Sequence, residues 1–184
     1  RNRGKGSAVR SAIPHITGPI AVIQDADLEC DPRDLPRLME PFLKGRAQVV
    51  YGVRNVSPLA YRSYALGGKL LSVMASILLG QPLRDINTCY KMIDSALLKS
   101  LPLEGTRFDL DMEITARVAR RGIRIHQVPI GYQPRSFQEG KKIRWTDGAI
   151  AAGVLLKIRF SRQTHGPRGG ATGLPAGHEA KGCS

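Results

Sequence analysis

The chain has 184 residues, of which 42% are hydrophobic and 23% are charged; this suffices for one folded domain and excludes a wholly disordered chain. Lysine and arginine outnumber the acidic residues by 28 to 15, and a net charge of +13 predicts an anionic partner: a phosphorylated ligand, a membrane surface or a nucleic acid. Three widely spaced cysteines argue against a disulfide framework or a structural zinc site and favour a reducing compartment.

Helices and strands are predicted to alternate along the chain. A short helix at 5–16, weakened at its end by Pro14, precedes a buried strand at 19–24. The later elements in chain order are a helix at 32–45, a strand at 47–53, a helix at 61–79, a strand at 88–93, helices at 95–100 and 109–121, a strand at 123–130 and a helix at 144–160. This order predicts an α/β layer fold with a largely parallel sheet. Residues 161–184, rich in Gly, Pro, Ala and Thr, are predicted to be a disordered tail after one domain of residues 1–160.

An acidic loop follows the first predicted strand. Asp25 and Asp27 leave the sheet two residues apart, and ligands of open α/β sheets bind beyond the carboxyl ends of the strands. Such hard oxygen ligands suit Mg²⁺ or Mn²⁺ carrying a substrate diphosphate, and Glu29 could add a third oxygen. The alternative is a solvated loop with a helix cap; this explains Asp31 and Asp34 better, because Pro32 stands at the first helical position.

Four segments, in the same order as in the family, resemble glycosyltransferase family 2, with the closest match in its dolichyl- or polyprenyl-phosphate mannosyltransferase branch. They are NRGKGSA at 2–8, QDADLECDP at 24–32, DINTCYK at 85–91, and VPI at 128–130 followed by PRSFQEGKKI at 134–143. The resemblance extends over about residues 2–160. One such motif would be weak evidence, but four in register are specific.

The resemblance implies a GT-A fold, a Rossmann-like and mostly parallel sheet that holds a nucleotide-sugar and a divalent cation, Mg²⁺ or Mn²⁺. Asp25 and Asp27 would face the metal and the diphosphate, and Glu29 stands where relatives have a Gln or Glu that contacts the metal. The implied reaction is inverting transfer of a hexose from GDP-mannose, or alternatively UDP-glucose, to a polyprenyl or dolichyl phosphate. Because that acceptor is already anionic, a strong general base is less necessary than for a hydroxyl acceptor.

The resemblance also implies further site residues. Asp85 matches a proposed base or positioning residue, and it joins Asp27 as a candidate catalytic residue; its alternative is a turn or cap before the strand at 88–93. Basic candidates for holding the lipid phosphate are Arg54, Arg62, Arg135, Lys141 and Lys142. Their alternative is an ordinary solvated basic surface, and Arg54 follows Val53 where the family has Ser.

Acidic residues also begin the helix predicted at 109–121. Asp109 is expected to cap this helix, and Glu113 is expected to form a stabilising ion pair with Arg117 four residues on. The four histidines are scattered and suggest no metal site.

Membrane contact is expected without a membrane span. The helices at 61–79 and 144–160 are apolar on one side, with basic residues beside the second, and such helices bind anionic interfaces. We therefore expect a cytoplasmic protein that is peripheral at the cytoplasmic face of a membrane. Ordinary core packing of both helices is an equal alternative.

The chain begins after the segments that hold the base and ribose in the family, so it is expected to lack the first strands of the sheet. One alternative is therefore a catalytically incomplete fragment acting only as a basic membrane-surface or nucleic-acid-binding module. Nucleic acid is not an expected partner, because aromatic residues are only 5% and there is no stacking motif.

Overall fold

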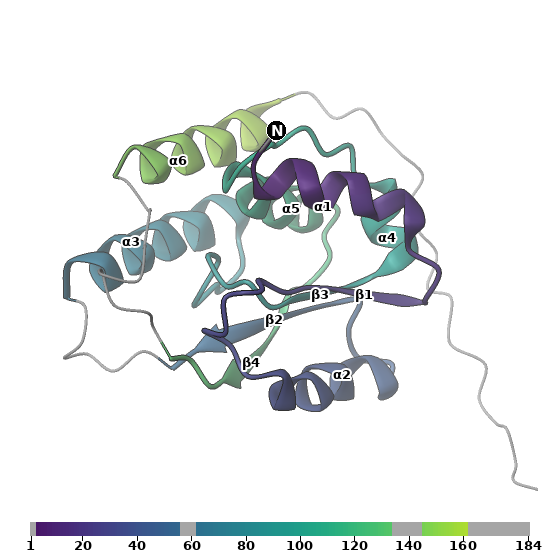
Figure 1. Ribbon diagram of the computed structural model, residues 1–184. Coiled ribbons are helices and arrows are strands. Elements are labelled where there is room, and N and C mark those ends of the chain that lie inside the picture. The colour runs from purple at the N-terminus through teal and green to yellow at the C-terminus, as the bar shows by residue number, and fades with distance from the viewer. Residues whose placement is uncertain (1–2, 56–61, 134–144, 162–184) are drawn as a thin grey trace, which may run out of the picture.

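The structure, a computed structural model, describes residues 3–55, 62–133 and 145–161, without the side chains of 62–67, 145–149 and 151. It forms a four-stranded sheet between two helical layers (Figure 1). In chain order the elements are α1 (Lys5–Ala12), a 3₁₀ turn (Ile13–His15), β1 (Ile20–Ile23), a 3₁₀ turn (Pro32–Asp34), α2 (Leu35–Leu43), β2 (Val49–Arg54), α3 (Arg62–Leu79), β3 (Lys91–Asp94), α4 (Ser95–Ser100), α5 (Asp109–Arg120), β4 (His126–Ile130) and α6 (Trp145–Phe160). Every predicted helix and strand is present, and when the 3₁₀ turns beside α1 and α2 are counted with those helices, the boundaries shift by up to three residues. The predicted tail after 161 lies outside the described residues.

The sheet has the strand order β1-β3-β2-β4 and is mixed, which corrects the expectation of a largely parallel sheet. β3 pairs antiparallel with both β1 and β2, and β4 pairs parallel with β2. Strands β1, β2 and β4 therefore run one way, and β3 runs against them between β1 and β2. The apolar pattern of a strand reads the same in either direction, so the sequence could not reveal this reversal.

Side chains from the two faces of the sheet enter two cores. Val49, Tyr51 and Ile93 point into the larger core, which α1, α3, α4, α5 and α6 cover. The intervening Val50 and Met92 point the other way, toward Leu38 and Phe42 of α2 and the smaller core. The period-2 alternation of β2 and β3 thus supplies both layers.

Helix α3 is apolar on both of its sides. Leu71, Met74 and Ala75 pack against the larger core. A second apolar stripe on this helix is exposed, with Leu70 70% and Ile77 77% accessible. Within the parts of the chain that the structure describes, no helix is both long enough and apolar enough to cross a bilayer.

Candidate functional site

The reversed strand gathers four chain segments at one edge of the sheet. β1 and β2 end at the edge where β3 begins, because Ile23 and Tyr51 both pair with Lys91. The acidic loop with Asp25 leaves β1 here, and Asp85 lies in the segment that leads into β3. Because β4 is parallel to β2, the segment after Ile130 also leaves from this edge. This carboxyl edge is where ligands of such sheets bind.

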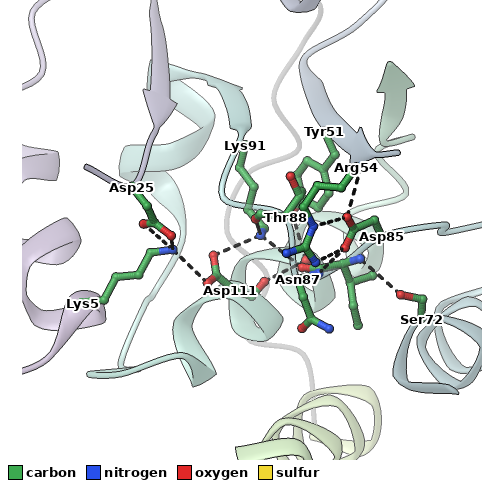
Figure 2. Close-up of polar contacts among 12 residues, drawn as sticks. Lys5, Asp25, Tyr51, Arg54, Ser72, Asp85, Asn87, Thr88, Lys91 and Asp111 are labelled. Atoms are coloured by element: carbon green, nitrogen blue, oxygen red, sulfur yellow. Dashed lines mark hydrogen bonds and ion pairs between the residues drawn. The ribbon is translucent and has the colours of Figure 1, made fainter. Parts of the chain in front are cut away.

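Asp25 has a lysine partner that sequence reasoning missed. Lys5 in the first turn of α1 places its Nζ 2.8 Å from Asp25 Oδ1 and 3.4 Å from Asp111 Oδ2 (Figure 2). Burial acts to lower the pKa of Lys5, but the nearby carboxylates of Asp111 and Asp25 raise it overall. Lys5 therefore stays charged between two acids from distant parts of the chain.

A fully buried lysine continues this chain of charges. Lys91 Nζ lies 3.0 Å from Asp111 Oδ1 and donates hydrogen bonds to the carbonyl oxygens of Ile86 and Thr88. Burial lowers the pKa of Lys91, and the charge of Asp111 opposes that shift. Sequence reasoning assigned no role to Lys91 or Asp111. The available signal was a lysine directly before the apolar residues Met92 and Ile93 of β3, because lysine is almost never fully buried unless it is paired.

Two glycines bring Lys5 into this position. Gly4 has a φ of 91°, and a Cβ at Gly6 would lie 2.7 Å from the backbone carbon of Thr106. The first turn of α1 thus lies directly against the backbone before α5, where the Ser7 amide donates to the Thr106 carbonyl at 3.0 Å. The Gly-Lys-Gly pattern in the sequence is explained by this close approach.

Gly6→Ala should therefore lower the free energy of unfolding by about 1–3 kcal/mol, the usual cost of overpacking, because both backbones would have to move apart. Urea denaturation would measure this change. Gly153→Ala is the control, because it adds the same methyl group in a helix where a Cβ meets nothing. Equal stability of the two variants would contradict the close-approach argument.

Arg54 and Asp85, predicted as a phosphate ligand and a candidate base, bind each other. Arg54 donates to Asp85 from Nε at 2.7 Å, from Nη2 at 2.9 Å and from its backbone amide at 3.3 Å. Burial tends to lower the pKa of Arg54, but Asp85 outweighs it and raises that pKa. Since both carboxylate oxygens accept from one guanidinium, this geometry favours the positioning role for Asp85 over the role of base.

A second set of contacts ties the acidic loop to the end of β4. The Arg54 guanidinium lies 5.0 Å from the centre of the Tyr132 ring, and the Tyr132 hydroxyl donates to Glu29 Oε2 at 2.8 Å. Leu28 has a φ of 63°, which turns the loop tightly enough for Asp27 Oδ1 to accept from the Glu29 amide at 3.1 Å. The acidic loop is thus held by Tyr132, which follows β4, and Tyr132 in turn lies against Arg54 at the end of β2.

The predicted metal ligands differ in their surroundings. In the portion of the chain that is described, no group of three His, Cys, Asp or Glu side chains is placed to enclose a metal ion. Glu29 is turned toward Tyr132, while Asp25 and Asp27 follow β1 as predicted. Two such carboxylates fit a Mg²⁺ or Mn²⁺ ion that takes its remaining ligands from substrate phosphates and water.

The other basic candidates cannot be placed. Arg62 begins α3, but its side chain lies outside the described residues, as do Arg135, Lys141 and Lys142.

The acids predicted at the start of α5 lie within the described residues. The Glu113–Arg117 pair is confirmed at 2.7 Å, whereas the predicted cap at Asp109 is wrong. Phe108 occupies the cap position without a side-chain bond, and Asp109 accepts instead from the Arg107 amide, because the chain already turns before the helix.

Cys30, at the end of the acidic loop, contacts Cys89 in the segment before β3. They are buried free thiols whose Sγ atoms lie 3.1 Å apart, although 59 positions separate them. Their hydrogen bond lowers the pKa of Cys89. This contact fastens the start of the second 3₁₀ turn to the segment before β3.

Known proteins resemble this chain in sequence and in structure. Residues 1–101 match the family model Glycosyl transferase family 2. Glycosyltransferase AglJ of Haloferax volcanii is 29% identical over 171 residues, which are 89% of this chain and 54% of that protein. Undecaprenyl-phosphate mannosyltransferase of Micrococcus luteus is 32% identical over 148 residues, 77% of this chain and 59% of that protein. The chain thus spans somewhat more than half the length of these relatives.

The fold agrees with this match. Glucosyl-3-phosphoglycerate synthase of Mycobacterium tuberculosis, crystallised with Mn²⁺, UDP-glucose and phosphoglyceric acid, superposes with a TM-score of 0.65 at 22% identity, covering 88% of this chain and 56% of that one. This likeness supports the predicted GT-A-like fold, here with a mixed sheet. Since the family model covers more than half of the sequence, the chain belongs to glycosyl transferase family 2.

Proposed function

We propose that the protein transfers a hexose from a nucleotide-sugar to a polyprenyl phosphate in a metal-dependent, inverting reaction. The observation that carries this proposal is the position of Asp25 and Asp27, directly beyond β1 at the carboxyl edge of a GT-A-like sheet. Family membership supports a nucleotide-sugar donor, and the fold relative contains UDP-glucose and Mn²⁺.

The polyprenyl phosphate acceptor rests on one relative, the undecaprenyl-phosphate mannosyltransferase, and on the family resemblance of the segment at 85–91. Mannose from GDP-mannose is the preferred donor group, and glucose from UDP-glucose is the alternative. A phosphate acceptor needs no deprotonation, which is consistent with an Asp85 whose two carboxylate oxygens both accept from the Arg54 guanidinium.

The residues of the carboxyl edge would divide the work of this reaction. Asp25 and Asp27 would hold the metal, which neutralises charge on the departing nucleoside diphosphate. Asp85 would fix the Arg54 guanidinium, and Tyr132 supports the same guanidinium from its ring face. The acceptor phosphate would bind basic residues, for which Arg62, Arg135, Lys141 and Lys142 remain the proposed set.

The exposed apolar stripe of α3 supports peripheral membrane contact. Leu70, Val73 and Ile77 are more than half exposed on this helix, and α6 adds Phe160. A surface of this kind beside a net charge of +13 suits an anionic lipid interface, where a polyprenyl acceptor resides. We accordingly propose a location at the cytoplasmic face of a membrane.

The test is a transfer assay with undecaprenyl phosphate in vesicles and either GDP-[¹⁴C]mannose or UDP-[¹⁴C]glucose, with Mn²⁺ or Mg²⁺. We expect labelled lipid from one donor, at least ~100-fold more than with EDTA, because the leaving diphosphate then lacks its counter-ion. A reaction with 3-phosphoglycerate but not with the lipid would replace the proposed acceptor. Product formation that EDTA leaves unchanged would contradict the metal-dependent mechanism.

A further inference from the structure

Lys5 covers the carboxylate that is expected to face the metal. Its Nζ lies 2.8 Å from Asp25 Oδ1 and 3.1 Å from Oδ2, so one ammonium group contacts both oxygens (Figure 2). Both side chains are mostly sheltered from water, with 21% of Lys5 and 31% of Asp25 exposed. A cation is thus already bound at the oxygens that a divalent metal would require.

The charges behind Lys5 are balanced without a metal. Asp25, Lys5, Asp111 and Lys91 form an alternating row in which each charge touches the next at 3.4 Å or less. Lys91 is fully buried and anchors Asp111, so Asp111 is a fixed second partner for Lys5. A divalent ion added at Asp25 would be repelled by the positive charge of the nearby Lys5 ammonium. The repulsion would be strong, because the partly buried surroundings screen charges poorly.

We propose that Lys5 is an internal competitor of the metal at Asp25, so that Mn²⁺ or Mg²⁺ binds tightly only together with the donor diphosphate. The diphosphate brings negative charge that balances both cations, and Lys5 can then leave Asp25 while it keeps Asp111. This inference rests on the proposed function, since it deepens the role of the same site. It makes Lys5 a positioning residue that couples metal binding to donor binding.

The test measures Mn²⁺ affinity of the 184-residue chain without nucleotide, from the electron paramagnetic resonance signal of free Mn²⁺. We expect Lys5→Met to bind Mn²⁺ at least ~10-fold more tightly than the unchanged chain, because Asp25 loses its competing cation. Lys5→Gln should behave in the same way, and Lys5→Arg should not, because arginine keeps the positive charge. Lys44→Met is the matched control: it also removes one lysine paired with an acid, at the exposed C-terminal end of α2.

Two results would overturn the proposal. The first is a Mn²⁺ affinity that is unchanged or weaker in both Lys5→Met and Lys5→Gln. The second is tighter binding that survives when Asp25→Asn is added to Lys5→Met, because the gain would then arise elsewhere. An equal gain in Lys44→Met would also overturn it, by showing an effect of net charge alone.

Failure of the proposed function is separately visible. A chain that binds Mn²⁺ as expected but shows no change in Mn²⁺ affinity on adding GDP-mannose or UDP-glucose contradicts the nucleotide-sugar donor. In that case the comparison of the lysine variants still decides whether Lys5 competes with the metal. With a donor that binds, its effect on Mn²⁺ affinity should be at least ~10-fold larger in the unchanged chain than in Lys5→Met.

Discussion

Asp27→Ala is expected to lower kcat/KM for sugar transfer by ~100-fold or more. Asp27 lies in the loop beyond β1, and its carboxylate accepts a hydrogen bond from the Glu29 amide. The change therefore removes a proposed metal ligand and also loosens the loop. Loss of one preorganised charge-stabilising group at a reacting centre typically costs 10²–10³ in rate. Steady-state kinetics over a range of Mn²⁺ concentrations would measure the loss and show whether added metal reduces it.

Two variants separate the metal from the loop in this experiment. Asp27→Asn keeps an oxygen for the Glu29 amide but loses the charge, so it should be nearly as inactive as Asp27→Ala. Asp31→Ala is the matched control, because Asp31 lies in the same segment but only caps the 3₁₀ turn and pairs with Arg33 at the surface. Transfer at the normal rate by Asp27→Ala, or an equal loss in Asp31→Ala, would show that the metal assignment is wrong.

Asp111→Ala is expected to lower the free energy of unfolding by about 3–5 kcal/mol. The change removes the ion-pair partner of Lys91, which has no solvent exposure, and leaves an uncompensated buried charge. The pKa of Lys91 is already lowered by burial, and the loss of Asp111 should lower it further. Urea denaturation at several pH values would measure both effects.

The sign of the pH dependence follows from proton binding. Between the lowered pKa of folded Lys91 and its ordinary value of 10.5 in the unfolded chain, the unfolded state binds more protons. The stability of Asp111→Ala should therefore rise with pH across that window, because folded Lys91 becomes neutral. A flat or falling profile would contradict a buried, uncompensated lysine.

A double variant distinguishes the charge from packing. Lys91→Met with Asp111→Leu removes both charges and should recover most of the lost stability, as apolar replacements of buried ion pairs do. Asp109→Ala is the control on the same helix, because Asp109 accepts a hydrogen bond from the Arg107 amide and compensates no buried charge, so its loss should cost under ~1 kcal/mol. An Asp111→Ala protein as stable as this control would refute the importance of the buried pair.

Local sequence determined much of the architecture. Helix α4 occupies the predicted residues 95–100. Asp94 caps its start by accepting a hydrogen bond from the Leu97 amide, and the backbone becomes extended at Leu101, where the helix ends. Asp31 and Pro32 begin a helical turn as predicted, and β1 delivers the two aspartates to the end of a buried strand. Caps, turn residues and apolar periodicity act over a few residues, so the sequence alone displays them.

Only the tertiary structure decided how these elements assemble at the carboxyl edge. The reversal of β3, the Arg54–Asp85 pair and the contact of Cys30 with Cys89 join residues 31 to 74 positions apart. Lys5 and Asp111 meet across 106 positions. Neither partner of such a pair carries a local signal of the other. An apolar strand pattern has no direction, and a charged residue that becomes buried looks the same in the sequence as one that stays in water. Burial creates these pairs, because a lysine or carboxylate taken out of water must find its counter-charge wherever the folded chain supplies it.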